Sequence, residues 1–162
     1  MPKHVRLILI TIVLITLQTT IVSFTSIANI IPDVMLIWIV YIAISQGQIP
    51  ATLYGFAIGL LLDLISGQFL GLSALSKTIA GFLAGYFFHE NKIELNLAHY
   101  QFLIFVGIAS LAHNIIYFII FTQCSDVDLF TAVFRFGLFS ALYTTFVATI
   151  PMFINARRPM LR

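Results

Sequence analysis

Two charged side chains, Asp63 and Lys77, lie well inside long apolar stretches of the chain. Placing a charge in hydrocarbon costs at least about 2.5 to 3.5 kcal/mol, so each of them needs a partner. Both lie at similar distances from the short connection Ser66–Gly71, so two antiparallel helices would bring them to similar depth. We expect a salt bridge or a shared polar network between them. A site that binds an ion or carries protons is the functional alternative, but one carboxylate and one lysine are few groups for such a site.

A second group of polar residues recurs at helical spacing within the stretch 99–122: Ser110, His113, Asn114 and Tyr117. Residues at this spacing share one face of a helix, and in lipid that face must point into the bundle. We expect interhelical hydrogen bonds, each worth less than about 1 kcal/mol.

Catalysis by His113 is the alternative interpretation of this face. Ser73, in Gly71-Leu-Ser-Ala-Leu75, could act as the nucleophile of an intramembrane serine protease. The segment lacks the second glycine of a Gly-x-Ser-Gly motif, and Ser73 is expected near the outer surface rather than level with His113. We therefore expect no catalytic residue and no enzyme.

Other kinds of site have little support in the sequence. His4, His89 and His99 lie at polar ends, and no pair has metal-ligand spacing with a carboxylate at hand, so we expect no metal and no cofactor. Cys124 is a lone cysteine and cannot form an internal disulfide. A net charge of +2 with scattered basic residues argues against a nucleic acid partner.

The elements that must position these residues are membrane helices. Of 162 residues, 60% are hydrophobic and 9% are charged, which is far from the composition of a water-soluble domain. The apolar runs are continuous rather than alternating, and this favours helices over a barrel. The sequence predicts an all-α protein in contact with membrane lipid, forming a single integral membrane domain over residues 1–162.

Six spans are predicted, at about 5–27, 33–46, 50–66, 71–88, 99–122 and 133–155. The first run resembles a signal peptide, but its length and the spans that follow favour an uncleaved helix. The long run 34–62 is broken at Gln46–Pro50, where two amides, a glycine and a proline interrupt it. A re-entrant hairpin over 33–66 is the alternative to two spans.

The positive-inside rule supports this layout, with both termini in the cytoplasm. Six spans place the basic residues Lys3, Arg6, Lys92, Arg157, Arg158 and Arg162 in the cytoplasm, and the acidic residues Asp33, Asp126 and Asp128 outside. Pro32 and Asp33 read as a turn and a helix start, because proline suits the first turn and an acid there favours the helix dipole.

Small residues recur along two of the predicted helices: Gly55, Gly59, Gly67 and Gly71, then Ala80, Gly81, Ala84 and Gly85. Small residues let two helix backbones approach closely in lipid. These stripes predict helix packing, either inside the bundle or against another protein.

Together these motifs resemble the MreD family of rod-shape-determining membrane proteins. The resemblance rests on Pro32-Asp33 before an apolar helix, then Gly55-x3-Gly59-x3-Asp63-x2-Ser66-Gly67-x3-Gly71-Leu72-Ser73-Ala74-Leu75, and the helix ending at Gly85-Tyr86. It covers residues 30–88 best and is supported elsewhere by hydropathy, length and span number.

The resemblance implies a non-enzymatic scaffold of the cell-elongation machinery in the bacterial inner membrane. Such proteins associate with MreC through its single membrane anchor, and indirectly with RodA, a penicillin-binding transpeptidase and the actin-like MreB. The family also resembles the six-helix substrate-binding subunits of energy-coupling-factor transporters. A vitamin-type binding subunit is thus the second candidate function, and it would require a pocket of roughly 300 to 1,000 Å³.

Overall fold

The computed structural model describes residues 3–20, 30–67, 69–123 and 129–156, and every regular element in these ranges is helical. The first four helices are α1 (Lys3–Thr20), α2 (Val34–Gln46), α3 (Gln48–Ser66) and α4 (Leu72–Gly85). A 3₁₀ turn at Glu90–Lys92 leads into the short α5 (Ile93–Ala98), in a segment predicted as a loop, and α6 (Gln101–Gln123) follows. The last pass comprises α7 (Leu129–Thr131), a π-helical segment Ala132–Gly137, α8 (Leu138–Val147) and α9 (Thr149–Ala156).

Three of these helices are long and apolar enough to cross a membrane, namely Gln48–Ser66, Gln101–Gln123 and the pass Ala132–Ala156. Val5–Thr20, Val34–Gln46 and Leu72–Gly85 are shorter apolar helices. The predicted break within 34–62 falls at Gly47, so α2 and α3 are separate helices. The predicted extension of the first span through residue 27 lies outside the described residues.

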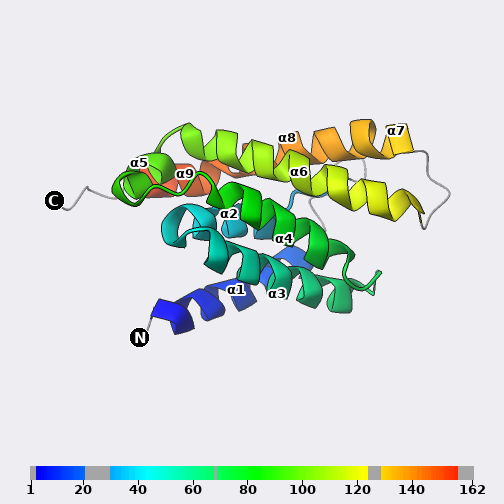
Figure 1. Ribbon diagram of the computed structural model, residues 1–162, viewed down its shortest axis with the longest axis horizontal. Coiled ribbons are helices and arrows are strands. Elements are labelled where there is room, and N and C mark those ends of the chain that lie inside the picture. Colours follow the sequence, from blue (N-terminus) through cyan, green and yellow to red (C-terminus); the bar gives the residue numbers. More distant parts are fainter. Residues whose placement is uncertain (1–2, 21–29, 68, 124–128, 157–162) are drawn as a thin grey trace.

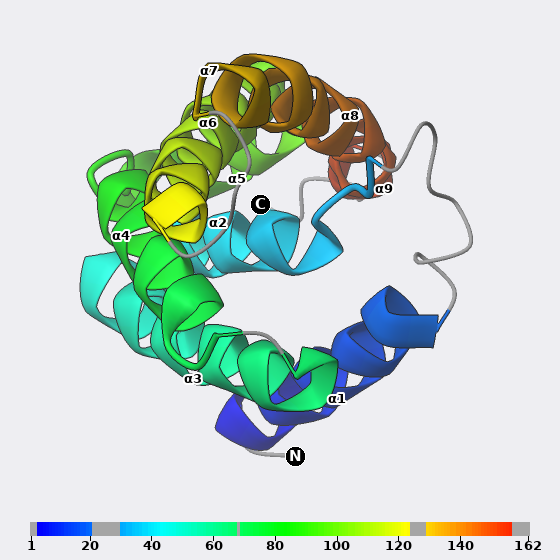
Figure 2. The same ribbon diagram turned by 90° about the vertical axis from the view of Figure 1, so that its right-hand side faces the viewer.

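The helix α2 forms the centre of the bundle. Its residues Met35, Leu36, Ile39, Val40, Ile42, Ala43 and Ile44 are fully buried. Leu36, Val40, Ile42, Ala43 and Ile44 pack with Ala80 and Ala84 of α4 and with Phe102, Val106 and Ala109 of α6. Met35 and Ile39 pack with Ile15 of α1 and Ile58 of α3. A helix that is apolar all round belongs in the interior, which explains how a helix of only 13 residues is accommodated. Figure 2 shows the other passes arranged around it.

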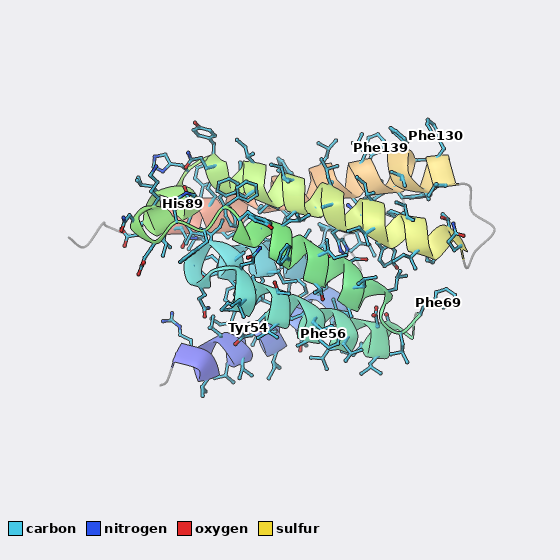
Figure 3. The ribbon with its side chains drawn as sticks, viewed as in Figure 1. Tyr54, Phe56, Phe69, His89, Phe130 and Phe139 are labelled. Carbon is cyan, nitrogen blue, oxygen red and sulfur yellow. The ribbon has the colours of Figure 1, made fainter. Side chains whose placement is uncertain are left out.

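Apolar side chains also cover the outside of the bundle. Phe56, Phe69, Phe130 and Phe139 point outward in Figure 3, and each is more than half exposed. Such a surface would be unfavourable in water and suits contact with lipid chains. Figure 1 places the start of α1, the segment around α5 and the end of α9 at one end of the bundle. The α3–α4 turn and α7 lie at the opposite end.

The helices α3 and α4 pack backbone against backbone through the small residues. A Cβ added at Gly55 would lie 2.6 Å from the Lys77 carbonyl oxygen, and one at Gly59 would lie 2.6 Å from the Ala74 nitrogen. A Cβ at Gly81 would lie 2.7 Å from the Ala51 carbonyl oxygen, and one at Gly85 would meet the Gln48 backbone. The alternative of a partner surface is therefore wrong for these four glycines, because their space is taken by the protein's own helices.

Gly67 and Gly71 serve a different purpose from the one predicted. Both have positive φ, at 65° and 94°, and a Cβ on either would meet nothing within 4 Å. The prediction of helix packing at these two positions is wrong. They form the α3–α4 turn, where glycine adopts the left-handed conformation without steric cost.

The close approach of α3 and α4 predicts different costs for two glycine substitutions. Gly59→Ala should lower the free energy of unfolding by about 1 to 3 kcal/mol, because the added methyl overlaps the α4 backbone. Gly107→Ala is the control, since its Cβ would lie 3.4 Å from Thr145 Oγ1, an ordinary contact. Thermal unfolding in detergent compares the two. Equal stability of both variants would contradict the packing described.

Candidate functional site

The start of α2 is held by side chains from several other helices. Asp33 caps α2, since its Oδ1 accepts a hydrogen bond of 3.0 Å from the Leu36 backbone N–H. The backbone N–H of Asp33 donates to Thr144 Oγ1 of α8 at 3.0 Å. Gln18 of α1 donates to the Pro32 carbonyl at 3.1 Å and accepts from the Val34 N–H at 3.0 Å. Orphan groups at a buried helix start are thereby satisfied without water.

The Asp33 carboxylate also forms the ion pair of the bundle interior. Its Oδ2 pairs with the Lys77 ammonium from α4, and His113 Nε2 of α6 lies 3.6 Å from the same oxygen. Lys77 is 3% exposed and His113 is 6% exposed. Paired charges of this kind hold two helices in register, because separating them would leave a charge unpaired in apolar surroundings.

Asp63 accepts hydrogen bonds from backbone amides instead of pairing with a side chain. Its carboxylate lies 2.9 Å from the Gly71 nitrogen, 3.1 Å from the Ser73 nitrogen and 3.2 Å from the Ala74 nitrogen. These N–H groups belong to the first turn of α4 and have no partner within that helix. A buried carboxylate at a helix N-terminus is favoured by these bonds and by the helix dipole.

The predicted Asp63–Lys77 salt bridge is therefore wrong, although both residues are buried as expected. The two residues are not level, because Lys77 packs opposite Gly55 whereas Asp63 lies about two turns further along α3. Asp63 lies against the start of α4, where amides are nearer than any ammonium. Lys77 points towards α2, where Asp33 supplies the opposite charge. Asp33 thus does more than start a helix.

The polar face of α6 points inward, as its burial shows. Asn114 donates from Nδ2 to the Gly137 carbonyl at 3.0 Å and so ties α6 to the π-helical segment. Among the described residues, Ser110 Oγ and His113 Nδ1 have no hydrogen-bond partner. Tyr117 is half-buried, stacks on Phe121 and meets the ring of Phe118 edge-on.

A cavity of about 640 Å³ opens beside this cluster, at the end of the bundle that contains the α3–α4 turn. Asp33, Lys77, His113 and Asn114 line it together with aliphatic and aromatic side chains. Ser73 and His113 both border this cavity, but no hydrogen bond joins them in the described part of the chain. No group of three or more potential metal ligands occurs among the described residues.

A second hollow is a groove of about 810 Å³ along α2, between α1 on one side and α8 and α9 on the other. Its walls are mainly apolar, and Trp38 and Tyr41 of α2, stacked with ring centroids 5.2 Å apart, form part of the floor. Trp38 Nε1 donates to Thr11 Oγ1 of α1 at 2.9 Å.

The sequence analysis did not predict that Gln18, Thr11 and Thr144 form hydrogen bonds between helices. The available signal was weak, because single polar residues in apolar runs are common and only their depth indicates a buried partner.

These features define an all-helical membrane protein built around a buried polar cluster. A family model described as rod shape-determining protein MreD matches residues 3–158, and the chain belongs to this family. The family consists of membrane proteins that act in rod shape determination and is not known for enzymatic activity. Comparison with curated proteins and comparison with solved structures each gave no match.

Double-mutant cycles distinguish the two possible pairings of Lys77. Lys77→Met should lower the free energy of unfolding by about 3 to 5 kcal/mol, because it leaves the Asp33 carboxylate buried and unpaired. Adding Asp33→Asn should recover about 1 to 3 kcal/mol of that loss. The matched cycle of Lys77→Met with Asp63→Asn should be additive within about 0.5 kcal/mol. Coupling in the second cycle and none in the first would restore the original pairing.

Proposed function

We propose that the protein is a non-enzymatic scaffold of the rod complex that binds the membrane anchor helix of MreC. Through MreC it would connect the MreB cytoskeleton with RodA and the penicillin-binding transpeptidase, and so with peptidoglycan synthesis. The observation that carries the proposal is the open groove beside α2, in a chain whose family acts in rod shape determination.

The groove suits a transmembrane helix as its occupant. The groove of about 810 Å³ runs along α2 and is lined mainly by apolar side chains, the kind of surface against which another membrane helix packs. Such a helix would cover the one side of α2 that α3, α4 and α6 leave open. Its remaining face would still contact lipid or another membrane partner.

The small-residue stripes support this location indirectly. In lipid, helices associate where backbones can approach closely. Gly55, Gly59, Gly81 and Gly85 already meet the backbone of the protein's own helices and offer no space to a partner. A partner helix must therefore dock elsewhere, and the groove is lined by large apolar side chains that provide dispersion contacts instead.

We further propose six crossings of the inner membrane with both termini in the cytoplasm. Arg6 and Lys92 are basic, and they belong to the start of α1 and to the turn before α5, at one end of the bundle (Figure 1). The α3–α4 turn, which carries no basic residue, lies at the other end (Figure 1). Basic residues are enriched on the cytoplasmic side, which assigns the first end to the cytoplasm. The short helices α2 and α4 are shielded by neighbours, so their length need not match the full bilayer.

A transporter subunit has no support in the comparisons, and no solved structure of an energy-coupling-factor subunit matches the chain.

Site-specific photo-crosslinking tests the groove. A benzoylphenylalanine at Ile150, which lines the groove and is 60% exposed, should crosslink to MreC in membranes. The same residue at Ile104, which is 50% exposed on α6 and does not line the groove, is the matched control. Crosslinks from Ile104 alone would place the anchor on another face. Failure of MreC to copurify with the unmodified protein would refute the scaffold role itself.

Labelling in intact cells tests the orientation. In a Cys124→Ser background, Phe69→Cys in the α3–α4 turn should react with a membrane-impermeant maleimide. Leu95→Cys in α5 should react only after the membrane is permeabilised, since α5 lies at the opposite end. The two positions are similarly exposed, at 52% and 46%, so accessibility within the protein does not bias the comparison. The reverse pattern would invert the proposed topology.

A further inference from the structure

The cavity near the α3–α4 turn combines a charged floor with an apolar wall. The charged side is made by Asp33 and Lys77, with His113 beside them. The apolar side includes Phe118, Phe136 and Leu62. Its volume of about 640 Å³ falls within the range of small-molecule sites, which are mostly apolar with a few converging polar groups. None of these features is needed for a helix to dock in the groove.

Unused hydrogen-bonding capacity remains at the floor of this cavity. An ammonium has three donors, and the Asp33 carboxylate is the hydrogen-bond acceptor of Lys77 among the described residues. His113 is 6% exposed and lines the same cavity, although its Nδ1 atom is itself buried. The remaining donors of Lys77, which also lines the cavity, are therefore the hydrogen-bonding capacity that a bound molecule could use.

The charge balance of the floor restricts the ligand. The charges of Lys77 and Asp33 cancel each other, so the ion pair contributes no net charge to the floor. A simple anion or cation would leave a net charge in a site of low dielectric, where uncompensated charge is costly. A zwitterion adds no net charge. Its anionic group can accept from Lys77 while its cationic group lies near Asp33, and every charge then has an opposite neighbour.

The apolar side of the cavity determines which uncharged part of the ligand it can bind. The rings of Phe118 and Phe136 lie with centroids 6.5 Å apart, so both contribute to one side of the cavity. Aromatic rings bind other rings in offset or edge-on arrangements. We propose that this cavity binds a small zwitterion with an apolar aromatic body, its charged groups on Lys77 and Asp33 and its ring against Phe118 and Phe136. The inference is independent of the scaffold role.

Three compounds with the same ring test the charge requirement. Phenylalanine is the zwitterion, 2-phenylethylamine carries the cation alone, and 3-phenylpropionate carries the anion alone. Ligand-observed NMR with the full chain in lipid nanodiscs should show saturable binding of phenylalanine. The other two compounds should bind at least about tenfold more weakly. Equal binding of all three, tighter binding of either single-charge compound, or no saturable binding would overturn the proposal.

Two variants on the π-helical segment test the wall without touching the ion pair. Phe136→Ala should weaken phenylalanine binding by about 3- to 10-fold, the range expected for loss of an aromatic contact. Phe134→Ala is the control, because Phe134 is 56% exposed and does not line the cavity.

A third variant removes the ion pair: Lys77→Met, checked for folding by size-exclusion chromatography, should abolish phenylalanine binding. Equal effects of Phe136→Ala and Phe134→Ala would place the bound molecule outside the cavity.

Discussion

The architecture depends on satisfying polar groups inside an apolar bundle. The start of α2 lies inside the bundle, and its backbone groups and carboxylate would be costly there if left unpaired. Asp33 caps its own helix, pairs with Lys77 and donates its backbone N–H to Thr144, while Gln18 bonds the neighbouring Pro32 and Val34. Helices α1, α2, α4 and α8 therefore meet at residues 32–34. Asp63 solves the same problem for α4 by accepting from its first amides.

Once these polar anchors are fixed, apolar packing determines the remaining arrangement. The apolar α2 is enclosed by α3, α4 and α6, and the glycines of α3 and α4 bring those two backbones into contact. The other side of α2 is left as a groove between the first and last passes. One side of α2 is therefore closed by the protein's own helices, and the other side is the groove on which the proposed docking of a partner helix rests.

Apolar runs and their breaks predicted the helices well, since Gly47 and the Gly67–Gly71 turn interrupt otherwise continuous stretches. Both Asp63 and Lys77 are buried, as predicted, but the expectation that they would lie level is wrong. Counting residues from the turn misplaced the register, because Gly55 faces Lys77 and Gly59 faces Ala74. The partner of Lys77 lies 44 residues earlier in the chain, beyond the reach of any local pattern. The groove and the cavity likewise arise only from the assembled bundle.

The backbone contact between α3 and α4 has a mechanical consequence. Two helices whose backbones touch, with no side chains between them, cannot slide or rotate independently, so α3 and α4 move as one rigid unit. The last pass packs closely on α6, whereas α1 is joined to the rest more sparsely, through the bond from Trp38 to Thr11 and the bonds of Gln18 with Pro32 and Val34. Any widening or narrowing of the groove would therefore be absorbed by movement of α1 against the rigid α3–α4 pair.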